Sequence, residues 1–273
     1  MPVVLALLAS LAACNETGGS APAVETASDI ELASFEALYE MTLGGTRPSA
    51  NVSDYDGLMS YTMSDTCDGW ASSQRTIARI GTLEGDELVS EFTSNSWESD
   101  DQTRFRFSSM SKLNGEITRE VRGDARREDF SKEGEVVFDK PEAQRAVLPA
   151  NVYFPNAQTI QALDAARAGA RFLSVPLFDG APENIPYDSV TVIGDGKTGV
   201  VPGEEEAGKS LANMKHWPMH IGYHEPDSED GLPDFEMEME VYENGVSSDL
   251  LIDYGDYTIN GRLIELRMVP GGC

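Results

Sequence analysis

The sequence predicts a mainly β protein, a single antiparallel β-spiral or barrel-like sheet of about a dozen strands with one helix near residues 156–168. The first observation behind this is alternation of apolar and polar residues, because successive side chains of a strand point to opposite faces of a sheet. The second is a set of Asn-Gly dipeptides, which favour the tight turns of hairpins. The third is that no stretch after residue 30 has the composition of an interdomain linker.

Several segments alternate in the manner of half-buried strands. The clearest is residues 235–241, in which every second residue is apolar and glutamates stand between them. Closing such a series of strands on itself removes exposed sheet edges, which favours a spiral or barrel-like sheet. The other segments are Phe35–Leu43, Thr103–Met110, Arg171–Phe178, Tyr187–Ile193 and Leu263–Val269.

Asn114-Gly115, Asn244-Gly245 and Asn260-Gly261 each predict a hairpin turn. Both central residues of a type I′ turn need positive φ, which Asn and Gly tolerate. The acidic, Gly-rich stretch from Gly194 to Gly208 is expected to be a long exposed loop.

One segment, residues 156–168, has helical rather than alternating periodicity. Ile160 and Leu163 are spaced as on one helix face among many alanines. Pro155 precedes the segment and Gly169 follows it, which is the usual order of helix start and stop residues.

The N-terminus reads as an export signal with a lipid attachment site. Residues 1–13 are expected to be a lipoprotein-type signal peptide, because their apolar run is too short to span a bilayer and ends in Leu11-Ala12-Ala13 before Cys14. Cys14 is the predicted lipidation site, and the expected location is the periplasm, with the chain tethered to a membrane through Cys14. The alternative is ordinary cleavage after Ala21-Pro22-Ala23, which would leave a soluble periplasmic protein.

Downstream of the signal, residues 14–30 are expected to be a flexible tether and residues 31–273 a single β domain. The net charge of −27 is strongly acidic and spread along the chain. Such a surface repels nucleic acid and anionic lipid headgroups, so neither is an expected direct partner.

The chain has three cysteines, Cys14, Cys67 and Cys273. If Cys14 carries lipid, Cys67 can pair only with Cys273, and an exported protein is free to form that disulfide. The chain-entropy model gives so long a loop about 5 kcal/mol of stability. The alternative is two buried free thiols. No histidine stands near either cysteine in the sequence, which argues against a catalytic thiol.

His216, His220 and His224 are regularly spaced and invite a metal hypothesis. Alternating apolar residues between them indicate a strand, on which each step of four residues covers about 13 Å. Such side chains cannot converge on one ion, so a solvated strand face is expected. Asp227–Gly231 lacks the ligand spacing of a calcium loop and is expected to be a turn.

Gly194–Thr198 contains Gly-Lys-Thr but lacks the upstream glycine and the following helix of a phosphate-binding loop, so no nucleotide is expected. The sequence has no Gly-x-Ser-x-Gly, and no carboxylate pair stands out as a catalytic dyad. We therefore expect no catalytic residue, no cofactor and no metal.

A series of short motifs spans most of the chain, and their order makes the set specific. Together they resemble the cell-envelope integrity protein family EipB over residues 35 to 273. The motifs are Cys67-Asp68-Gly69-Trp70, Phe105-Arg106-Phe107, Leu148-Pro149, Phe154-Pro155, Phe178-Asp179-Gly180, Trp217-Pro218, Pro233-Asp234-Phe235-Glu236, Tyr242-Glu243-Asn244-Gly245-Val246, Asp253-Tyr254-Gly255-Asp256-Tyr257 and a terminal Cys273.

The resemblance implies a periplasmic antiparallel β-spiral, a disulfide from Cys67 to Cys273, and maintenance of the envelope under stress without known catalysis. The chain departs from the family in three places. Asn156-Ala157-Gln158 stands where a histidine is expected, and Ser34-Phe35-Glu36 stands where a His-Arg pair is expected. A lipobox also replaces the plain cleavable signal.

The leading hypothesis is therefore a non-enzymatic envelope-integrity protein that presents its sheet to a periplasmic or membrane envelope protein. A second hypothesis is a periplasmic carrier that binds a lipid or acyl chain in a β cavity, which requires an open apolar cavity of several hundred Å³. A third is a hydrolase with dispersed carboxylates, which requires two carboxyl groups converging in a cleft.

Overall fold

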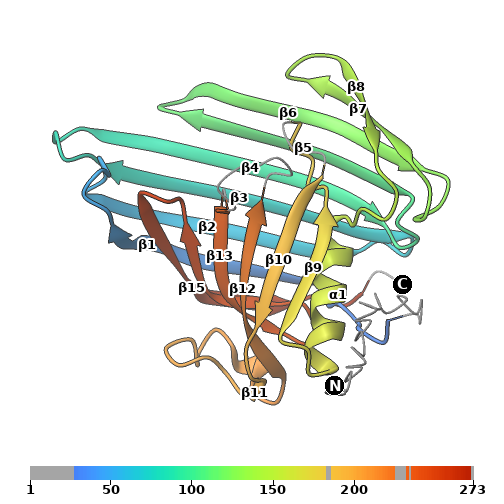
Figure 1. Ribbon diagram of the computed structural model, residues 1–273. Helices are drawn as coiled ribbons and strands as arrows, with labels where there is room; N and C mark the ends of the chain where they lie inside the picture. Colours follow the sequence, from blue (N-terminus) through green and yellow to red (C-terminus); the bar gives the residue numbers. More distant parts are fainter. Residues whose placement is uncertain (1–27, 183–185, 225–231, 234, 272–273) are drawn as a thin grey trace, which may run out of the picture.

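The computed structural model describes residues 28–182, 186–224, 232–233 and 235–271, and this part of the chain forms one antiparallel sheet with one α-helix (Figure 1). The mainly β fold class is confirmed, with fifteen strands where the sequence predicted about a dozen. The strands are β1 (Phe35–Thr46), β2 (Asp54–Asp65), β3 (Gly69–Gly81), β4 (Glu87–Ser99), β5 (Arg104–Leu113), β6 (Glu116–Arg127), β7 (Gly134–Lys140), β8 (Gln144–Leu148), β9 (Phe172–Leu177), β10 (Tyr187–Ile193), β11 (Lys197–Thr198), β12 (Lys215–His224), β13 (Phe235–Tyr242), β14 (Ser247–Asp253) and β15 (Tyr257–Met268). All the alternating segments predicted as strands fall within β1, β5, β9, β10, β13 and β15 or overlap them.

The sheet winds as an unclosed spiral. β1 lies between β2 and β15, and from this centre one arm runs out to β8 and the other to β9. In Figure 1, β9, β10, β12 and β13 cross steeply in front of the long strands β1–β6, so the sheet folds back over itself. The two arms meet where Tyr153, just after β8, forms a parallel bridge with Leu177 of β9. The barrel-like shape therefore comes from approach of the two ends, without a closed ladder of strands.

The predicted helix is confirmed as α1 (Pro155–Arg167). Pro155 begins it, and Gly169 adopts positive φ just beyond its end. Ala162, Leu163 and Ala166 are buried and join the main core cluster, so the helix packs against the inner side of the sheet.

Side chains on the inner face form two clusters. The main cluster gathers residues of β1, β2, β12–β15 and α1. The second lies against β5, β7 and the start of α1, and each of its aromatic rings is at most 7 % exposed. We call these rings the phenylalanine cluster; they are Phe105, Phe107, Phe138, Phe154 and Phe178.

The Asn-Gly dipeptides have different outcomes. Asn114-Gly115 joins β5 to β6, and both residues have positive φ, as a type I′ turn requires. Asn244-Gly245 also joins two strands, β13 and β14, but only Gly245 has positive φ, so the hairpin is confirmed without that turn type.

Asn260-Gly261 is not a turn, and this prediction is wrong. Both residues lie inside β15, where Gly261 pairs with Met41 and Leu250. A Cβ at Gly261 would stand 3.0 Å from the Met41 sulfur and 3.1 Å from the Leu250 Cβ. The glycine is thus required by close packing between strands.

The prediction of a long exposed loop at 194–208 is also wrong in part. Lys197 and Thr198 form β11 against β12, and a 3₁₀ helix, η1 (Lys209–Leu211), follows the segment. Val201 and Glu204 are buried, and the Glu204 carboxylate accepts the Leu263 N–H at 2.7 Å. The segment folds onto the sheet because it provides these buried contacts.

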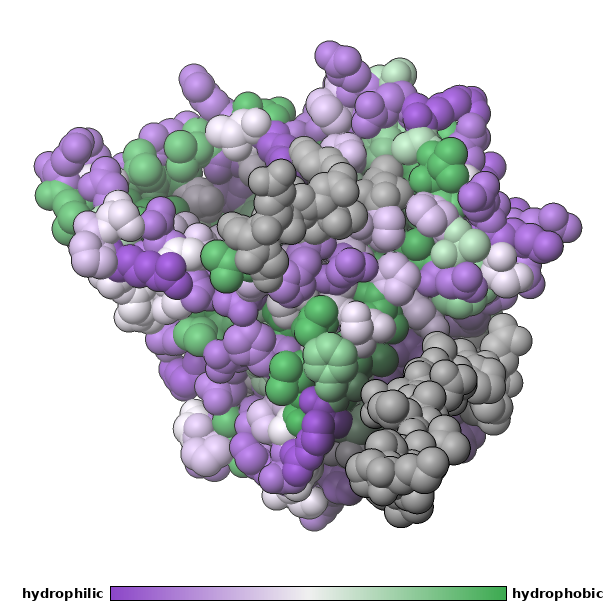
Figure 2. All heavy atoms as spheres, viewed as in Figure 1, coloured by the Kyte–Doolittle hydropathy of each residue, from purple (hydrophilic) through white to green (hydrophobic). Residues whose placement is uncertain are grey.

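Hydrophilic side chains cover most of the face shown in Figure 2, with apolar side chains in small separate groups. Within the described residues, no helix is both long and apolar enough to cross a membrane. The predicted signal peptide and the turn at Asp227–Gly231 lie outside the described residues.

Candidate functional site

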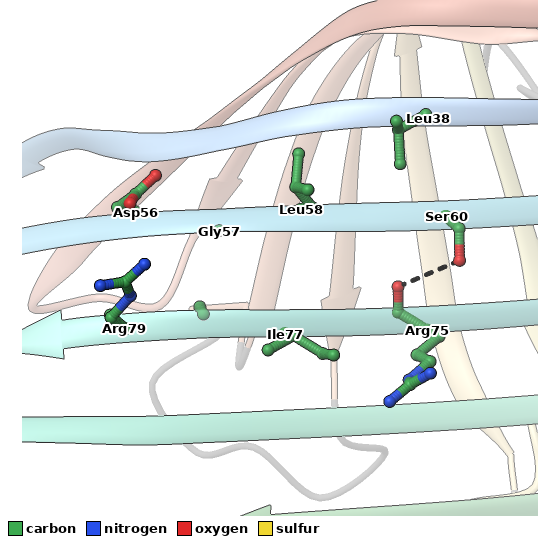
Figure 3. A pocket seen from close by; sticks show the side chains of 9 residues that line it. Leu38, Asp56, Gly57, Leu58, Ser60, Arg75, Ile77 and Arg79 are labelled. Atoms are coloured by element: carbon green, nitrogen blue, oxygen red, sulfur yellow. Dashed lines mark hydrogen bonds between the residues drawn. The ribbon is translucent and has the colours of Figure 1, made fainter.

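Three apolar side chains form a strip across the outer face of β1, β2 and β3. We call Leu38, Leu58 and Ile77 the outer strip. Leu58 and Ile77 are cross-strand partners and are 49 % and 40 % exposed. Leu38 lies diagonal to Leu58 because its own partner on β2 is Ser60. These side chains line a surface depression of about 400 Å³ (Figure 3).

The floor of this depression is backbone. Gly57 and Ala78 line it and are cross-strand partners, but their positions belong to the buried, inner-facing phase of β2 and β3. A Cβ at Gly57 would come within 2.8 Å of the Ala78 Cβ, so the inner side is closely packed. The outer strip can therefore be reached only from the outer face.

Charged side chains flank the outer strip at both ends. Asp56 pairs across the strands with Arg79, and Ser60 pairs with Arg75, which places the two arginines on either side of Ile77 (Figure 3). Arg75 lies 3.8 Å from Glu91, whereas Arg79 makes no ion pair with any residue that the structure describes. An unpaired guanidinium beside apolar side chains suits a ligand that carries both apolar groups and a carboxylate.

Glu98 places a buried carboxylate at the N-terminus of α1. It is 2 % exposed and accepts the N–H groups of Asn156 and Ala157 at 2.8 and 2.9 Å. The Gln102 side chain donates to it at 2.6 Å. Burial raises the pKa of Glu98 to about 7, although these hydrogen bonds and Arg127 favour its charged form. The carboxylate takes the place of a helix cap, which the residue before α1 does not supply.

Arg127 completes this network. It donates to the Gln102 carbonyl at 2.6 Å and to the Val152 carbonyl at 2.8 Å. Its guanidinium packs over the rings of Phe130 and Phe154 at 4.7 and 4.8 Å. The groups that hydrogen-bond to Glu98 are thus all amides, and Arg127 acts on it only through its charge, which fits a structural anchor.

The three histidines lie on β12, as the alternation predicted, but the expectation of a solvated face is wrong for His216. His216 is only 4 % exposed, and its Nδ1 lies 2.8 Å from Glu240. Lys197 of β11 donates to the same carboxylate at 2.7 Å, and the Tyr242 ring packs 4.8 Å from the imidazole. The segment that folds along β12 therefore removes this histidine from water.

His220 remains half-exposed, with Nε2 2.9 Å from Glu236 and Nδ1 3.3 Å from Glu238. Across the part of the chain that the structure describes, no group of three or more His, Cys, Asp and Glu side chains could hold a metal ion. Lys197 and Thr198 form a strand where a phosphate-binding loop would lead into a helix.

Cys67 lies in the turn between β2 and β3 with φ of 69° and is disulfide-bonded. Its N–H donates to Asp65 at 2.8 Å. Cys14 and Cys273 both lie outside the described residues. The pairing of Cys67 with Cys273 and the lipidation of Cys14 therefore stay predictions.

A family model described as EipB-like matches residues 26–270. The chain belongs to the EipB-like family. It is 30 % identical over 276 residues to the cell envelope integrity protein EipB of Brucella abortus, covering 99 % of this chain and 96 % of that protein. This relative supports an envelope-integrity role. The crystal structure of a beta-barrel-like protein of a domain of unknown function, DUF1849, from Brucella abortus matches with a TM-score of 0.80 and 26 % identity. That match covers 88 % of this chain and 99 % of the other.

The family and fold expected from the motifs are confirmed, but the sequence pattern alone does not single out the outer strip of this EipB-like protein. Its signal is an apolar residue at a water-facing position between polar neighbours. Leu58 follows Asp56 at that phase of β2, and Ile77 stands between Arg75 and Arg79 on β3. These two apolar residues lie side by side only because β2 and β3 are paired in this register.

A second depression of about 290 Å³ lies beside Ile117, Lys140 and Pro141, where β6 meets β7. Both depressions are open surface features of the EipB-like sheet. The carrier hypothesis requires an open apolar cavity inside the sheet, and it stays a prediction.

Proposed function

We propose that this EipB-like protein is a non-enzymatic periplasmic protein, tethered to a membrane through lipidated Cys14, that supports envelope integrity under stress by binding an envelope protein at its outer strip. Similarity to a cell envelope integrity protein across nearly the whole chain supports the role. The lipobox at Leu11–Cys14 supports the location.

The outer strip is the observation that carries the proposal. Leu58 and Ile77 are adjacent apolar side chains, each more than a third exposed, on a protein with a net charge of −27. Covering both would remove apolar surface from water, and Arg79 has a guanidinium free to meet a carboxylate. The partner that fits is an extended protein segment bearing apolar side chains next to an acidic one.

The non-enzymatic part of the proposal is supported by how the buried titratable groups are used. Glu98 is held by the first N–H groups of α1. His216 is held by Glu240 and packs against the Tyr242 ring. Each of these groups stabilises a junction between elements, and neither lines the depression on the outer face.

The proposal is tested in cells that lack the gene. Deletion should sensitise them to detergent and to cell-wall antibiotics, and wild-type protein should restore resistance. A Leu58→Glu/Ile77→Glu variant should fail to restore it at equal protein level, because charge replaces the apolar contact. The matched control is Val192→Glu, an apolar residue of β10 that is 52 % exposed. Unchanged resistance after deletion, or full rescue by the double variant, would contradict the proposal.

The tether is tested separately by the mass of the mature protein. A diacylated N-terminal Cys14 is expected. A lipid-free N-terminus following Ala23 would show a soluble periplasmic protein instead.

A further inference from the structure

A continuous row of aromatic side chains follows one rim of the sheet. Successive ring centroids lie between 5.4 and 6.2 Å apart. The row crosses the rim where β12 ends and β13 begins. In Figure 1 this rim is at the upper ends of the steep strands drawn in front. We call it the aromatic row; its members are Tyr187 on β10, Tyr223 on β12, Phe235 on β13, Tyr254 in the turn after β14 and Tyr257 on β15.

The aromatic row belongs to the inner face of the sheet. Tyr223 lies two residues after the buried Ile221, and Tyr257 lies two residues before the buried Ile259, so each shares a face with the core. Phe235 and Tyr257 also pack against the main cluster. The row is therefore separate from the outer strip, which faces the other way.

The aromatic row is not sealed as a core would be. Tyr254 is 49 % exposed and the other four rings are half-buried. Four of the five members are tyrosines, which combine an apolar ring with a hydroxyl suited to contact with water or a polar ligand. Such a row offers ring faces and hydroxyl groups at the same surface.

Carboxylates stand at both ends of the row. Burial raises the pKa of Tyr223, the second ring, and the charge of Asp179 raises it further. At the other end, Asp253 accepts the Gly255 N–H at 2.6 Å, and Asp256 accepts the Ser49 hydroxyl at 2.7 Å.

These last contacts shape the turn that presents Tyr254. Gly255 has φ of 82°, a conformation that suits glycine, and the bond from Asp253 fixes it. Each of the two aspartates uses one oxygen to hold the turn, and Asp256 keeps its second oxygen for a ligand. The second oxygen of Asp253 forms an ion pair with Arg47 at 3.9 Å.

We propose that the aromatic row binds an uncharged saccharide chain along the rim of the sheet. The electron-rich ring faces pack against the C–H faces of sugar rings. The phenol and carboxylate oxygens accept hydrogen bonds from sugar hydroxyls.

Other ligand classes fit this chemistry less well. The acidic groups around the row and the net charge of −27 repel phosphates and anionic lipids. A proline-rich peptide presents mainly carbonyl acceptors, which could use the tyrosine hydroxyls of the row but not its carboxylates. A saccharide presents many hydroxyl donors, which is what the ends of the row can accept.

Calorimetric titration of the folded protein with maltohexaose, cellohexaose and laminarihexaose tests the proposal. At least one of these neutral saccharides should bind. Tyr254→Ala should weaken that binding about tenfold through loss of one stacked ring. Tyr254→Phe, which keeps the ring, should lose much less. The matched control is Phe172→Ala, an aromatic residue 58 % exposed on β9 and outside the row, which should bind as wild type.

Tyr257→Leu provides a second variant of the row, in case the turn is sensitive to replacement of Tyr254. The Leu58→Glu/Ile77→Glu variant should bind saccharide normally, so failure at the outer strip and failure at the row are distinguishable. The proposal is overturned if none of the three saccharides binds, or if both row variants bind as wild type. It is also overturned if a proline-rich peptide or an acidic saccharide occupies the row instead.

Discussion

The phenylalanine cluster and the aromatic row use similar ring spacing for different ends. Centroids of neighbouring rings lie 5.0 to 6.5 Å apart in the first and 5.4 to 6.2 Å apart in the second. The cluster contains only phenylalanine and is at most 7 % exposed, whereas the row is mostly tyrosine, with four half-buried rings and one exposed ring, Tyr254. A buried ring that has no polar atom contributes to the stability of the fold. A tyrosine at a solvent-exposed rim has a hydroxyl that can bind a ligand.

The position of each group in the spiral explains the difference. The phenylalanine cluster lies where the two arms of the sheet approach each other. There Tyr153 exchanges backbone hydrogen bonds with Pro176 and Phe178, both at 2.9 Å. An unclosed sheet has backbone N–H and C=O groups at its edges that could pair with other chains if water and those chains could reach them. The buried rings close this junction to solvent. The aromatic row lies at a rim, where no such closure is required.

The largest effect that would separate the two groups is expected at Phe154. This ring is fully buried, lies 5.0 Å from Phe105, and carries the Arg127 guanidinium on its face. Phe154→Ala should lower the free energy of unfolding by about 3–5 kcal/mol, because it leaves a cavity in a packed cluster. Urea denaturation measures this loss. Phe154→Leu should cost less, and a loss below about 1 kcal/mol for the alanine variant would show that the cluster is not a plug.

The two groups of rings should also differ in how pH affects stability, because the titrating residue Glu98 lies beside the phenylalanine cluster and not beside the aromatic row. The pKa of Glu98 rises from its ordinary 4.5 to about 7 on folding, chiefly through burial. At pH values between 4.5 and about 7, the folded protein therefore holds a proton on Glu98 that the unfolded chain has released. The stability from this group is fully present below pH 4.5 and is lost as the pH rises through 7, about 3 kcal/mol in all.

Urea denaturation at several pH values tests this sign. Repulsion among the many acidic groups changes over the same range, so the readout is the difference in slope between wild type and Glu98→Gln. Glu98→Gln should flatten the fall in stability between pH 5 and 7. Phe154→Leu, which leaves the carboxylate in place, should keep the wild-type slope. Equal slopes for wild type and Glu98→Gln would refute the titration of this group.

Much of the fold could be predicted because its signals are local. Alternation located strands such as β13, and the helix was found from spacing and its flanking Pro155 and Gly169. Asn114-Gly115 formed the expected turn, but Asn260-Gly261 did not, although the dipeptide is the same. Its glycine is required by Met41 and Leu250 on neighbouring strands, and a local pattern carries no information on such contacts.

The candidate sites were harder to predict because they depend on register between distant strands. Leu58 and Ile77 become neighbours only through the pairing of β2 with β3. The aromatic row joins residues from 187 to 257, and only its Asp253–Tyr257 motif stands out along the chain. Glu98 reaches α1 across 58 residues. Each site is a product of topology, which sequence periodicity does not specify.

The smallest effect, and the one that most sharpens the comparison, is expected at Tyr254. Its ring contacts Phe235 at 5.6 Å and Tyr257 at 5.4 Å, but nearly half of it faces water. Tyr254→Ala should therefore cost about 1 kcal/mol or less in urea denaturation, and Tyr254→Phe should be neutral. A loss as large as that of Phe154→Ala would mean that the row is sealed in the folded protein and serves stability. A small loss together with weakened saccharide binding would mean that the rings are held at the rim for a ligand.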